Sequence, residues 1–306
     1  MVRNRKITYI FSGVLVAASF VSLLLWGIKP GIDFTGGSLL EATYPSGRPE
    51  ITLITKAANE LGFGNVLIQP SGDSDIIVRL RDISEQEHQK LLSALAIGDK
   101  IPEEKRFDSI GPVIGKELRQ KSWIAVIIVA LMIILYIAFA FRKVSRPASP
   151  SLGGPVASWK YGVAAVIALI HDVSIPSGLF AILGRFKGVE VDILFITAIL
   201  TTLGFSVHDT IVVFDRIREN LKKGIGMNFD DTVEKSIRQT VTRSIITSLT
   251  VIFVLISLLI FGPASTKYFS LTLLVGIAFG TYSSIFLASP LLVSWQKWQE
   301  KRKTKK

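Results

Sequence analysis

Residues 244–266 read SIITSLTVIFVLISLLIFGPAST, and residues 268–296 read YFSLTLLVGIAFGTYSSIFLASPLLVSWQ, with Lys267 as the one charge between them. A helix of about 20 apolar residues crosses the hydrocarbon core of a bilayer, because each residue adds about 1.5 Å of length. The two stretches hold 23 and 29 residues without a charge, so each predicts a membrane-spanning helix. The sequence therefore predicts a polytopic α-helical membrane protein.

Four further spans meet the same criterion. Two carry no charge over 22 and 20 residues, and two are apolar apart from one His-Asp pair in each. This pattern argues against a soluble enzyme or a nucleic-acid-binding domain, and the absence of cysteine excludes a disulfide framework. The six predicted transmembrane helices are 7–28, 122–141, 161–184, 193–214, 242–262 and 268–294.

The distribution of Lys and Arg predicts the orientation of these spans. With the N-terminus inside, the cytoplasmic segments hold 19 Lys and Arg residues, and the two short outer loops hold three. Short loops rich in Lys and Arg stay in the cytoplasm, so we expect both termini there. The net charge of +11 then comes from cytoplasmic flanks that lie near anionic lipid, and we expect no nucleic-acid partner. Ribosomal RNA or another negative partner is the less favoured interpretation of the basic tail.

This topology divides the chain into four parts. We expect an extracytoplasmic domain between the first two spans, and nothing catalytic is visible in it, because the sequence lacks GxxxxGK[ST], HExxH and GxSxG. The domain is therefore expected to bind or to act mechanically, not as an enzyme. The parts are 1–28 (cytoplasmic N-terminus and first span), 29–121 (extracytoplasmic domain), 122–294 (five-helix membrane region) and 295–306 (basic cytoplasmic tail).

The extracytoplasmic segment predicts a small α+β domain. Ser84 and Glu87 form a capping box, in which each side chain satisfies the other's backbone N–H, and this starts the second helix. We expect His88, the next residue, on a solvent-exposed helix face. The order βαββαβ is that of a ferredoxin-like domain. The expected elements are a strand at 38–44, a helix at 51–61, strands at 65–68 and 76–80, a helix at 84–98 and a strand at 106–110.

Three charged residues inside the predicted spans are the candidate functional residues: Asp172, Asp209 and Arg243. A charge at the bilayer centre costs at least about 2.5–3.5 kcal/mol, so such residues tend to be kept for function. Asp172 lies near the bilayer centre, and Pro176 four residues later cannot donate to its carbonyl. One hypothesis is a proton or ion relay element, and the other is a polar pair with His171 that fixes helix packing.

Asp209 and Arg243 are predicted at similar depth in adjacent spans, so an ion pair between them is geometrically allowed. Burial disfavours a charged carboxylate and a nearby Arg favours it, so movement of the Arg would let the Asp take up or release a proton. We favour this switch over a static pair, because a static buried pair is better replaced by apolar packing. His208 is a supporting residue, as suited to packing as to shuttling protons.

Two weaker patterns concern helix surfaces. The run 215–220 predicts an amphipathic exit from the membrane with charge pairs three and four residues apart. Gly204 with Ser206, and Gly276 with Gly280, are spaced for close helix contact, which we interpret as core packing.

Four motifs carry a family resemblance that extends over essentially the whole chain. The chain resembles the SecF family of protein-export membrane proteins, which belongs to the RND superfamily. The resemblance implies half of an RND-type bundle, with six helices and a large domain between the first two. The motifs are Gly31-Ile32-Asp33-Phe34-Thr35-Gly36-Gly37, His171-Asp172, the run 207–220 that ends in Asp215-Arg216-Ile217-Arg218-Glu219-Asn220, and Gly280-Thr281-Tyr282-Ser283-Ser284.

The resemblance also implies a function. It implies a subunit that works with SecD beside the SecYEG translocon, with YajC and YidC as further partners, in late stages of protein translocation across the cytoplasmic (inner) membrane. The proton motive force would drive this step without a cofactor, and the extracytoplasmic domain would hold the unfolded preprotein. Asp209 and Arg243 match family positions associated with proton passage, whereas Tyr268 stands near a position where some relatives have an acid.

Some alternatives stay open from the sequence. Sodium could replace the proton as coupling ion, and an RND-type exporter half-subunit for a small molecule or lipid is the alternative function. A structural assembly factor, in which the buried charges only specify helix pairing, is a third. The Gly36-Gly37 pair is expected to let the backbone turn after the first span, and not to bind a ligand.

Overall fold

The computed structural model describes residues 2, 5–141 and 158–304. The described chain divides into two compact units, Met1–Lys29 with Ala125–Lys306, and Pro30–Ile124. We call these the helical unit and the α+β unit. Several of the residues counted above as cytoplasmic cations lie outside the described residues: Arg3, Arg142, Lys143, Arg146, Lys305 and Lys306.

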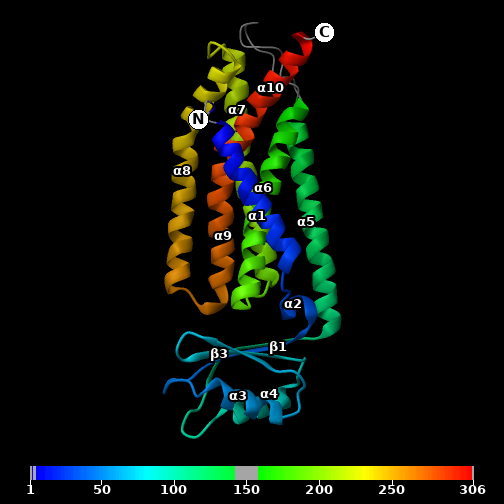
Figure 1. Ribbon diagram of the computed structural model, residues 1–306, viewed down its shortest axis with the longest axis vertical. Coiled ribbons are helices and arrows are strands. Elements are labelled where there is room, and N and C mark those ends of the chain that lie inside the picture. The colour runs from blue at the N-terminus through cyan, green and yellow to red at the C-terminus, as the bar shows by residue number, and fades with distance from the viewer. Residues whose placement is uncertain (1, 3–4, 142–157, 305–306) are drawn as a thin grey trace. The chain divides into compact units, whose positions relative to one another are not determined.

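The α+β unit contains a four-stranded antiparallel sheet with strand order β2-β3-β1-β4, and both long helices cover the same face of it (Figure 1). This is the predicted βαββαβ order, preceded by one short helical turn. Alternate residues of β3 are buried, which gives the sheet one core face. The elements are α2 (Ile32–Thr35), β1 (Gly37–Thr43), α3 (Ile51–Glu60), β2 (Leu67–Ser71), β3 (Asp75–Leu80), α4 (Glu85–Leu95) and β4 (Glu103–Ile110).

The core of the α+β unit lies between the sheet and its two helices. Leu40 of β1 pairs in register with Val78 of β3 and with Phe107 of β4, and α3 and α4 close the core with Ile54, Ala58, Leu91 and Leu95. Tyr44 is fully buried and its hydroxyl donates to the Leu95 carbonyl over 2.9 Å. Burial raises the pKa of the Tyr44 phenol to about 12.

Two strands differ from the prediction by more than one residue, β2 and β4. β2 begins two residues later than expected and includes Pro70, which a strand at the edge of a sheet tolerates because one of its sides has no partner. β4 begins three residues earlier, at Glu103, over a charged and exposed stretch that carries no apolar alternation. The sequence of this stretch does not predict a strand. The length of β4 is determined by its hydrogen-bonded pairing with β1.

His88 is buried, so the expectation of a solvent-exposed side chain is wrong. The ring is 3% exposed and stacks on Phe107 with centroids 3.7 Å apart. Its Nδ1 lies 3.3 Å from a Glu85 oxygen, and its Nε2 lies 3.2 Å from Glu104. His88 precedes Leu91 by three residues and therefore shares the helix face that packs on the sheet. The capping box of Ser84 and Glu87 is confirmed.

Gly36 and Gly37 allow the turn that leads into β1, as predicted. Their φ angles are +75° and +127°, which favour glycine. Both are also sites of close approach, which the sequence did not reveal. A Cβ on Gly36 would lie 2.7 Å from Pro112 Cα, and one on Gly37 would lie 2.7 Å from the Leu80 carbonyl oxygen.

The helical unit contains the predicted transmembrane helices, and six described helices are long and apolar enough to cross a membrane. The most buried are α6, α7 and the α9–α10 helix, whereas α1, α5 and α8 bury few of their side chains. A π-helical turn, Ser284–Ala288, joins α9 to α10. The elements are α1 (Arg5–Trp26), α5 (Pro112–Ala140, whose first part lies in the α+β unit), α6 (Ser158–Lys187), α7 (Ile193–Lys223), α8 (Phe229–Phe261), α9 (Ala264–Ser283) and α10 (Ser289–Thr304).

The helices run well beyond their apolar stretches. The expected connection 215–241 is nearly all helix, since α7 ends at Lys223 and α8 begins at Phe229. Gly224, in the left-handed region with φ +69°, ends α7, and the Asn228 side chain accepts from the backbone N–H of Asp231 to start α8. The charged residues on both sides of this turn therefore lie on helices.

Small residues bring α7 and α9 into close contact. A Cβ on Gly276 would lie 2.3 Å from the Thr202 hydroxyl oxygen, and one on Gly280 would lie 3.0 Å from Ser206 Cβ. The interpretation of this GxxxG as a packing motif is confirmed. It is wrong for Gly204, which is exposed and whose added Cβ would meet nothing within 4 Å.

Candidate functional site

The carboxylate of Asp172 on α6 is fully buried and joins three helices. His171 Nδ1 lies 2.8 Å from Asp172 Oδ1. The hydroxyls of Ser206 on α7 and Ser283 on α9 both donate to Asp172 Oδ2, the second over 2.8 Å. A buried charge needs paired or hydrogen-bonded neighbours, and here two of the three partners are neutral hydroxyls.

Local backbone features place these partners. Gly280 lets α9 approach Ser206 closely, and Ser283 is the last residue before the π-helical turn. π-Helical turns inside α-helices are frequent at functional sites, because they re-aim the side chains around them. On the other side, α6 continues through Pro176, which supplies no N–H to the Asp172 carbonyl.

Asp209 on α7 is the second buried carboxylate, 2% exposed. Thr281 Oγ1 donates to its Oδ2 over 3.4 Å, and His208 Nδ1 lies 3.8 Å from its Oδ1. The Thr281 hydroxyl also shares a hydrogen bond with Ser248 on α8. Asp209 therefore contacts the same short stretch of α9 as Asp172, since Thr281 and Ser283 are two residues apart.

The ion pair considered between Asp209 and Arg243 is not formed. Both residues are described, and no nitrogen of Arg243 lies within ion-pair distance of the Asp209 carboxylate. Arg243 is exposed, whereas Ser244 next to it is buried. The side chains of consecutive helix residues point in directions about 100° apart. Arg243 therefore lies at a depth that allows the ion pair, but its side chain does not point toward Asp209. Arg243 instead lines a cavity between α5, α7 and α8.

The two histidines differ in environment. His208 is 59% exposed, whereas His171 is 2% exposed and its ring stacks near Tyr282 with centroids 6.1 Å apart. Within the described chain, His171 Nε2 is buried without a hydrogen-bond partner. The Tyr282 hydroxyl donates to the Thr8 carbonyl and accepts from Ser12, both on α1. Of the two, His171 belongs to the buried polar cluster and His208 lies at its edge.

The structure thus brings together three of the predicted site residues, Asp172, His171 and Asp209, and adds hydroxyls that the sequence reading missed. We call this set, with the hydroxyl residues, the carboxylate cluster. A signal for it existed, because Thr281 and Ser283 lie in one of the four motifs. The added hydroxyl residues are Ser206, Ser248, Thr281 and Ser283.

The charged C-terminal end of α7 has a structural role. Glu219 pairs with Arg216 at 2.8 Å and with Lys223 at 2.6 Å, as the spacing predicts. Asn220 is buried, and its amide donates to Ser236 at 2.8 Å and to Gln239 at 2.9 Å on α8. Asn220 therefore ties α7 to α8, a role that the sequence pattern did not show.

The remaining predicted residues lie elsewhere. Gly31 precedes α2, and its carbonyl accepts from the backbone N–H of Phe34, which is buried in the α+β unit. Asp33 lies within the same short helix. Tyr268 contacts the ring of Phe180 edge-on, with the ring centroids 6.2 Å apart. Asp215 and Arg218 line the cavity that Arg243 also lines.

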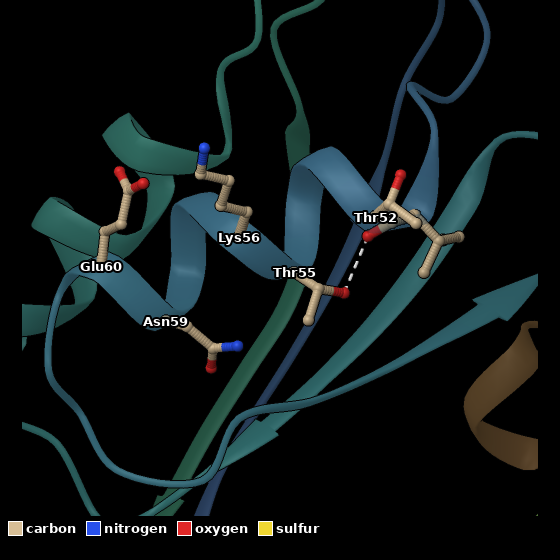
Figure 2. Close-up of a pocket in the computed structure, with 6 residues that line it drawn as sticks. Thr52, Thr55, Lys56, Asn59 and Glu60 are labelled. Carbon is tan, nitrogen blue, oxygen red and sulfur yellow. Dashed lines mark hydrogen bonds between the residues drawn. The ribbon is translucent and has the colours of Figure 1, made fainter.

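The α+β unit offers a hollow of about 690 Å³ along α3, but its lining is not that of a catalytic site (Figure 2). All lining residues come from this one helix, and the hydrogen bond drawn there is internal to it, from Thr55 to the Ile51 carbonyl at 2.7 Å. Among the residues that the structure describes, no group of three or more His, Cys, Asp or Glu could hold a metal ion.

Comparison with known proteins identifies the relatives of the chain. Residues 92–149 and 156–298 match the family described as "Protein export membrane protein SecD/SecF, C-terminal". The chain is 42% identical over 309 residues to the protein translocase subunit SecF of Thermobaculum terrenum, covering 97% of this chain and 93% of that protein. It is 38% identical to the protein translocase subunit SecF of Anaerolinea thermophila, covering 96% and 92%. These relatives are named as translocase subunits and not as catalytic enzymes.

A solved structure is also similar. The crystal structure of SecDF, a translocon-associated membrane protein from Thermus thermophilus, matches with a TM-score of 0.81 and 31% sequence identity. The match covers 97% of this chain, but the chain spans 38% of the length of that protein. The fold of the helical and α+β units is thus that of the matched part of SecDF.

Proposed function

This chain belongs to the SecF family of protein translocase subunits, and on that premise we propose that it works with a SecD-type subunit in proton-driven late stages of protein translocation. The main support for this proposal is the carboxylate cluster. Two buried carboxylates, Asp172 and Asp209, are both hydrogen-bonded to one stretch of α9.

The chemistry of the partners suits a carboxylate that changes its protonation state. A hydroxyl can donate to a carboxylate and, after rotation, accept from a carboxylic acid. Thr281 and Ser283 can therefore partner Asp209 and Asp172 in either state. A guanidinium has no acceptor for the O–H of a carboxylic acid, so it favours the charged form. The cluster thus holds the carboxyl groups without fixing their charge.

Arg243 completes the switch in this proposal. In the conformation described, Arg243 is exposed and Asp209 is bonded to Thr281. A rotation of α8 about its axis would exchange Ser244 for Arg243 on the face toward Asp209. Approach of the guanidinium would favour release of the proton, and its withdrawal would favour uptake.

Energetics limit what one proton can do. One charge crossing 100 mV provides about 2.3 kcal/mol, whereas shifting a conformer from 1:99 to 99:1 needs about 5.5 kcal/mol. Two carboxyl groups that each carry a proton would provide about 4.6 kcal/mol, close to that requirement. We therefore expect either more than one proton per cycle, or two conformations of the α+β unit that differ little in free energy.

The wider setting is part of the same proposal. We place the multi-pass chain in the cytoplasmic (inner) membrane with both termini in the cytoplasm. The SecD-type partner would correspond to the rest of the SecDF chain, and the SecYEG translocon, YajC and YidC would be neighbours. The α+β unit would hold the unfolded preprotein, and anionic lipid would lie at the cytoplasmic flanks. The exporter alternative is less favoured, because the hollow along α3 is lined by residues of this one helix.

Proteoliposomes with the translocon, a SecD-type subunit and this chain test the proposal. A preprotein is stalled after ATP-driven initiation, ATP is removed, and a proton or a sodium gradient is imposed. We expect the wild type to complete translocation with the proton gradient and Asp209→Asn to fail despite normal assembly. Completion by Asp209→Asn at the wild-type rate would mean that the charge of Asp209 has only a structural role. Completion by the wild type with the sodium gradient alone would mean that sodium, and not the proton, is the coupling ion.

A further inference from the structure

The imidazole of His171 on α6 is buried and uses only one of its two nitrogens within the described chain. Its Nδ1 lies 2.8 Å from Asp172 Oδ1, and its Nε2 is buried without a hydrogen-bond partner. Buried polar atoms are nearly always hydrogen-bonded, and a bound water is the usual partner where no protein group serves. We propose that His171 and Tyr282 form a proton route from Asp172 to the end of the helical unit at which α1 begins. This inference rests on the proposed function, in which Asp172 carries a proton.

The chemistry of imidazole suits this step, because the ring takes up a proton at one nitrogen and releases one at the other. The acid proton on Asp172 Oδ1 would pass to His171 Nδ1, which leaves a carboxylate and an imidazolium. The imidazolium would then lose its Nε2 proton to a water molecule and become neutral, with the transferred proton on Nδ1. Asp172 Oδ2 accepts from the hydroxyls of Ser206 and Ser283. The two oxygens of the carboxyl group therefore have different partners, and the route uses Oδ1.

Tyr282 on α9 continues the route toward α1. Its ring stacks near that of His171, with centroids 6.1 Å apart. Its hydroxyl donates to the Thr8 carbonyl over 3.3 Å and accepts from Ser12 over 3.4 Å. Thr8 and Ser12 lie within about two turns of the start of α1 at Arg5. Because a phenol both donates and accepts, the Tyr282 hydroxyl can take a proton from water and pass one on toward the start of α1.

The route is separate from the surroundings of Asp209. The residues of the route lie on α6, α9 and α1. Asp209 is on α7 and bonds to Thr281, which in turn bonds to Ser248 on α8. The two buried carboxyl groups thus have different neighbours on the side away from α9. We therefore expect Asp172 to exchange its proton without the participation of Arg243.

Time-resolved infrared spectroscopy of the full chain, reconstituted in one orientation with a SecD-type subunit, tests the route. The C=O stretch of protonated Asp172, assigned by its loss in Asp172→Asn, is followed after the pH is raised from an acidic value on the side at which α1 begins. His171→Gln should slow deprotonation of Asp172 about 100-fold, because Gln offers a donor to Oδ1 but takes up no proton. Tyr282→Phe keeps the stacked ring, loses the hydroxyl and should also slow this step.

Tyr9→Phe is the matched control. The Tyr9 hydroxyl also ties α1 to the α9–α10 helix, through Ser294 at 3.0 Å, but Tyr9 is not one of the residues of the route. We expect the wild-type rate in Tyr9→Phe. Equal slowing in Tyr9→Phe and Tyr282→Phe would mean that loosening of α1 is the cause, and the wild-type rate in His171→Gln would mean that the proton leaves Asp172 elsewhere.

Either of these two results would overturn the route and leave proton coupling at the carboxylate cluster intact. A wild type in which Asp172 exchanges no proton would contradict proton uptake by Asp172 itself, and the route with it. Thermal unfolding of each variant is measured alongside, and we expect His171→Gln to unfold near the wild-type temperature while its proton exchange is slow. A fall in unfolding temperature with an unchanged exchange rate would assign His171 a structural role only.

Discussion

The hydroxyl of Ser283, the last residue of α9, donates a 2.8 Å hydrogen bond to the fully buried carboxylate of Asp172 on α6. The π-helical turn begins at the next residue. A change in the charge of Asp172 would therefore act directly on the one irregular turn of the α9–α10 helix. This links a buried carboxyl group to the π-helical turn.

Ser283→Ala should weaken both stability and transport. The substitution removes one of three partners of a buried carboxyl group, and loss of a hydrogen bond of this kind costs about 1–3 kcal/mol. We expect a lower thermal unfolding temperature in detergent and slower proton-driven completion of translocation. Ser257→Ala is the control, because Ser257 is exposed on α8 and bonds to the Phe253 carbonyl of its own helix. Equal effects of the two substitutions would argue against a special role of the Asp172 contact.

Gly276→Ala should separate α7 from α9. The new Cβ would lie 2.3 Å from the Thr202 hydroxyl oxygen, and overpacking of this kind costs about 1–3 kcal/mol. Gly204→Ala introduces the same methyl group into open space, where alanine is the better helix former by about 1 kcal/mol. Thermal unfolding should therefore move in opposite directions for the two variants. A loss of stability in Gly204→Ala as large as that in Gly276→Ala would contradict the packing described.

His88→Ala should destabilise the α+β unit by about 2–4 kcal/mol, within the range for truncation of large buried side chains. The ring stacks on Phe107 at 3.7 Å, so His88→Phe should retain most of that stability. Hydrogen exchange of the α4 amides in the full chain measures the effect. Fast exchange in His88→Phe comparable to that in His88→Ala would mean that the contacts with Glu85 and Glu104 matter more than the stacking.

The capping box predicts a pH dependence at acid pH. The Arg81 guanidinium and the Ser84 backbone N–H hold the pKa of Glu87 at about 2, below its ordinary value of 4.5. A lowered pKa favours folding when the carboxyl is charged, so this contribution is present above about pH 4.5 and is lost as the pH falls toward 2. Protection of the α4 amides should decline over this range in the wild type. Glu87→Gln should remove the decline and Glu60→Gln should not, and an unchanged decline in Glu87→Gln would contradict this assignment.

Much of the fold could be predicted from the sequence, because uncharged runs longer than a bilayer is thick allow few alternatives. The capping box and the βαββαβ order were equally local signals. Both buried acids, Asp172 and Asp209, could also be found by sequence, since a charge within an apolar run stands out. Their depth follows from counting residues along a helix.

What could not be predicted is the rotation of each helix about its axis. Arg243 and Ser244 are neighbours in sequence, yet one is exposed and the other is buried. For the same reason, the sequence did not predict that hydroxyls of α9 bond to the two carboxylates, or that His88 is buried. These positions depend on which side of a helix packs against its neighbours, and for α9 that side is set by the close approach of Gly276 and Gly280 to α7.

The most direct test of proton uptake by the carboxylate cluster is infrared difference spectroscopy. The chain is reconstituted with a SecD-type subunit, and the C=O stretch of protonated carboxylic acids is recorded before and after a proton gradient is imposed. We expect a gradient-dependent signal that disappears in Asp209→Asn and changes in Asp172→Asn. A signal that persists unchanged in both variants, or no gradient-dependent signal in the wild type, would contradict the claim that these carboxyl groups carry the proton.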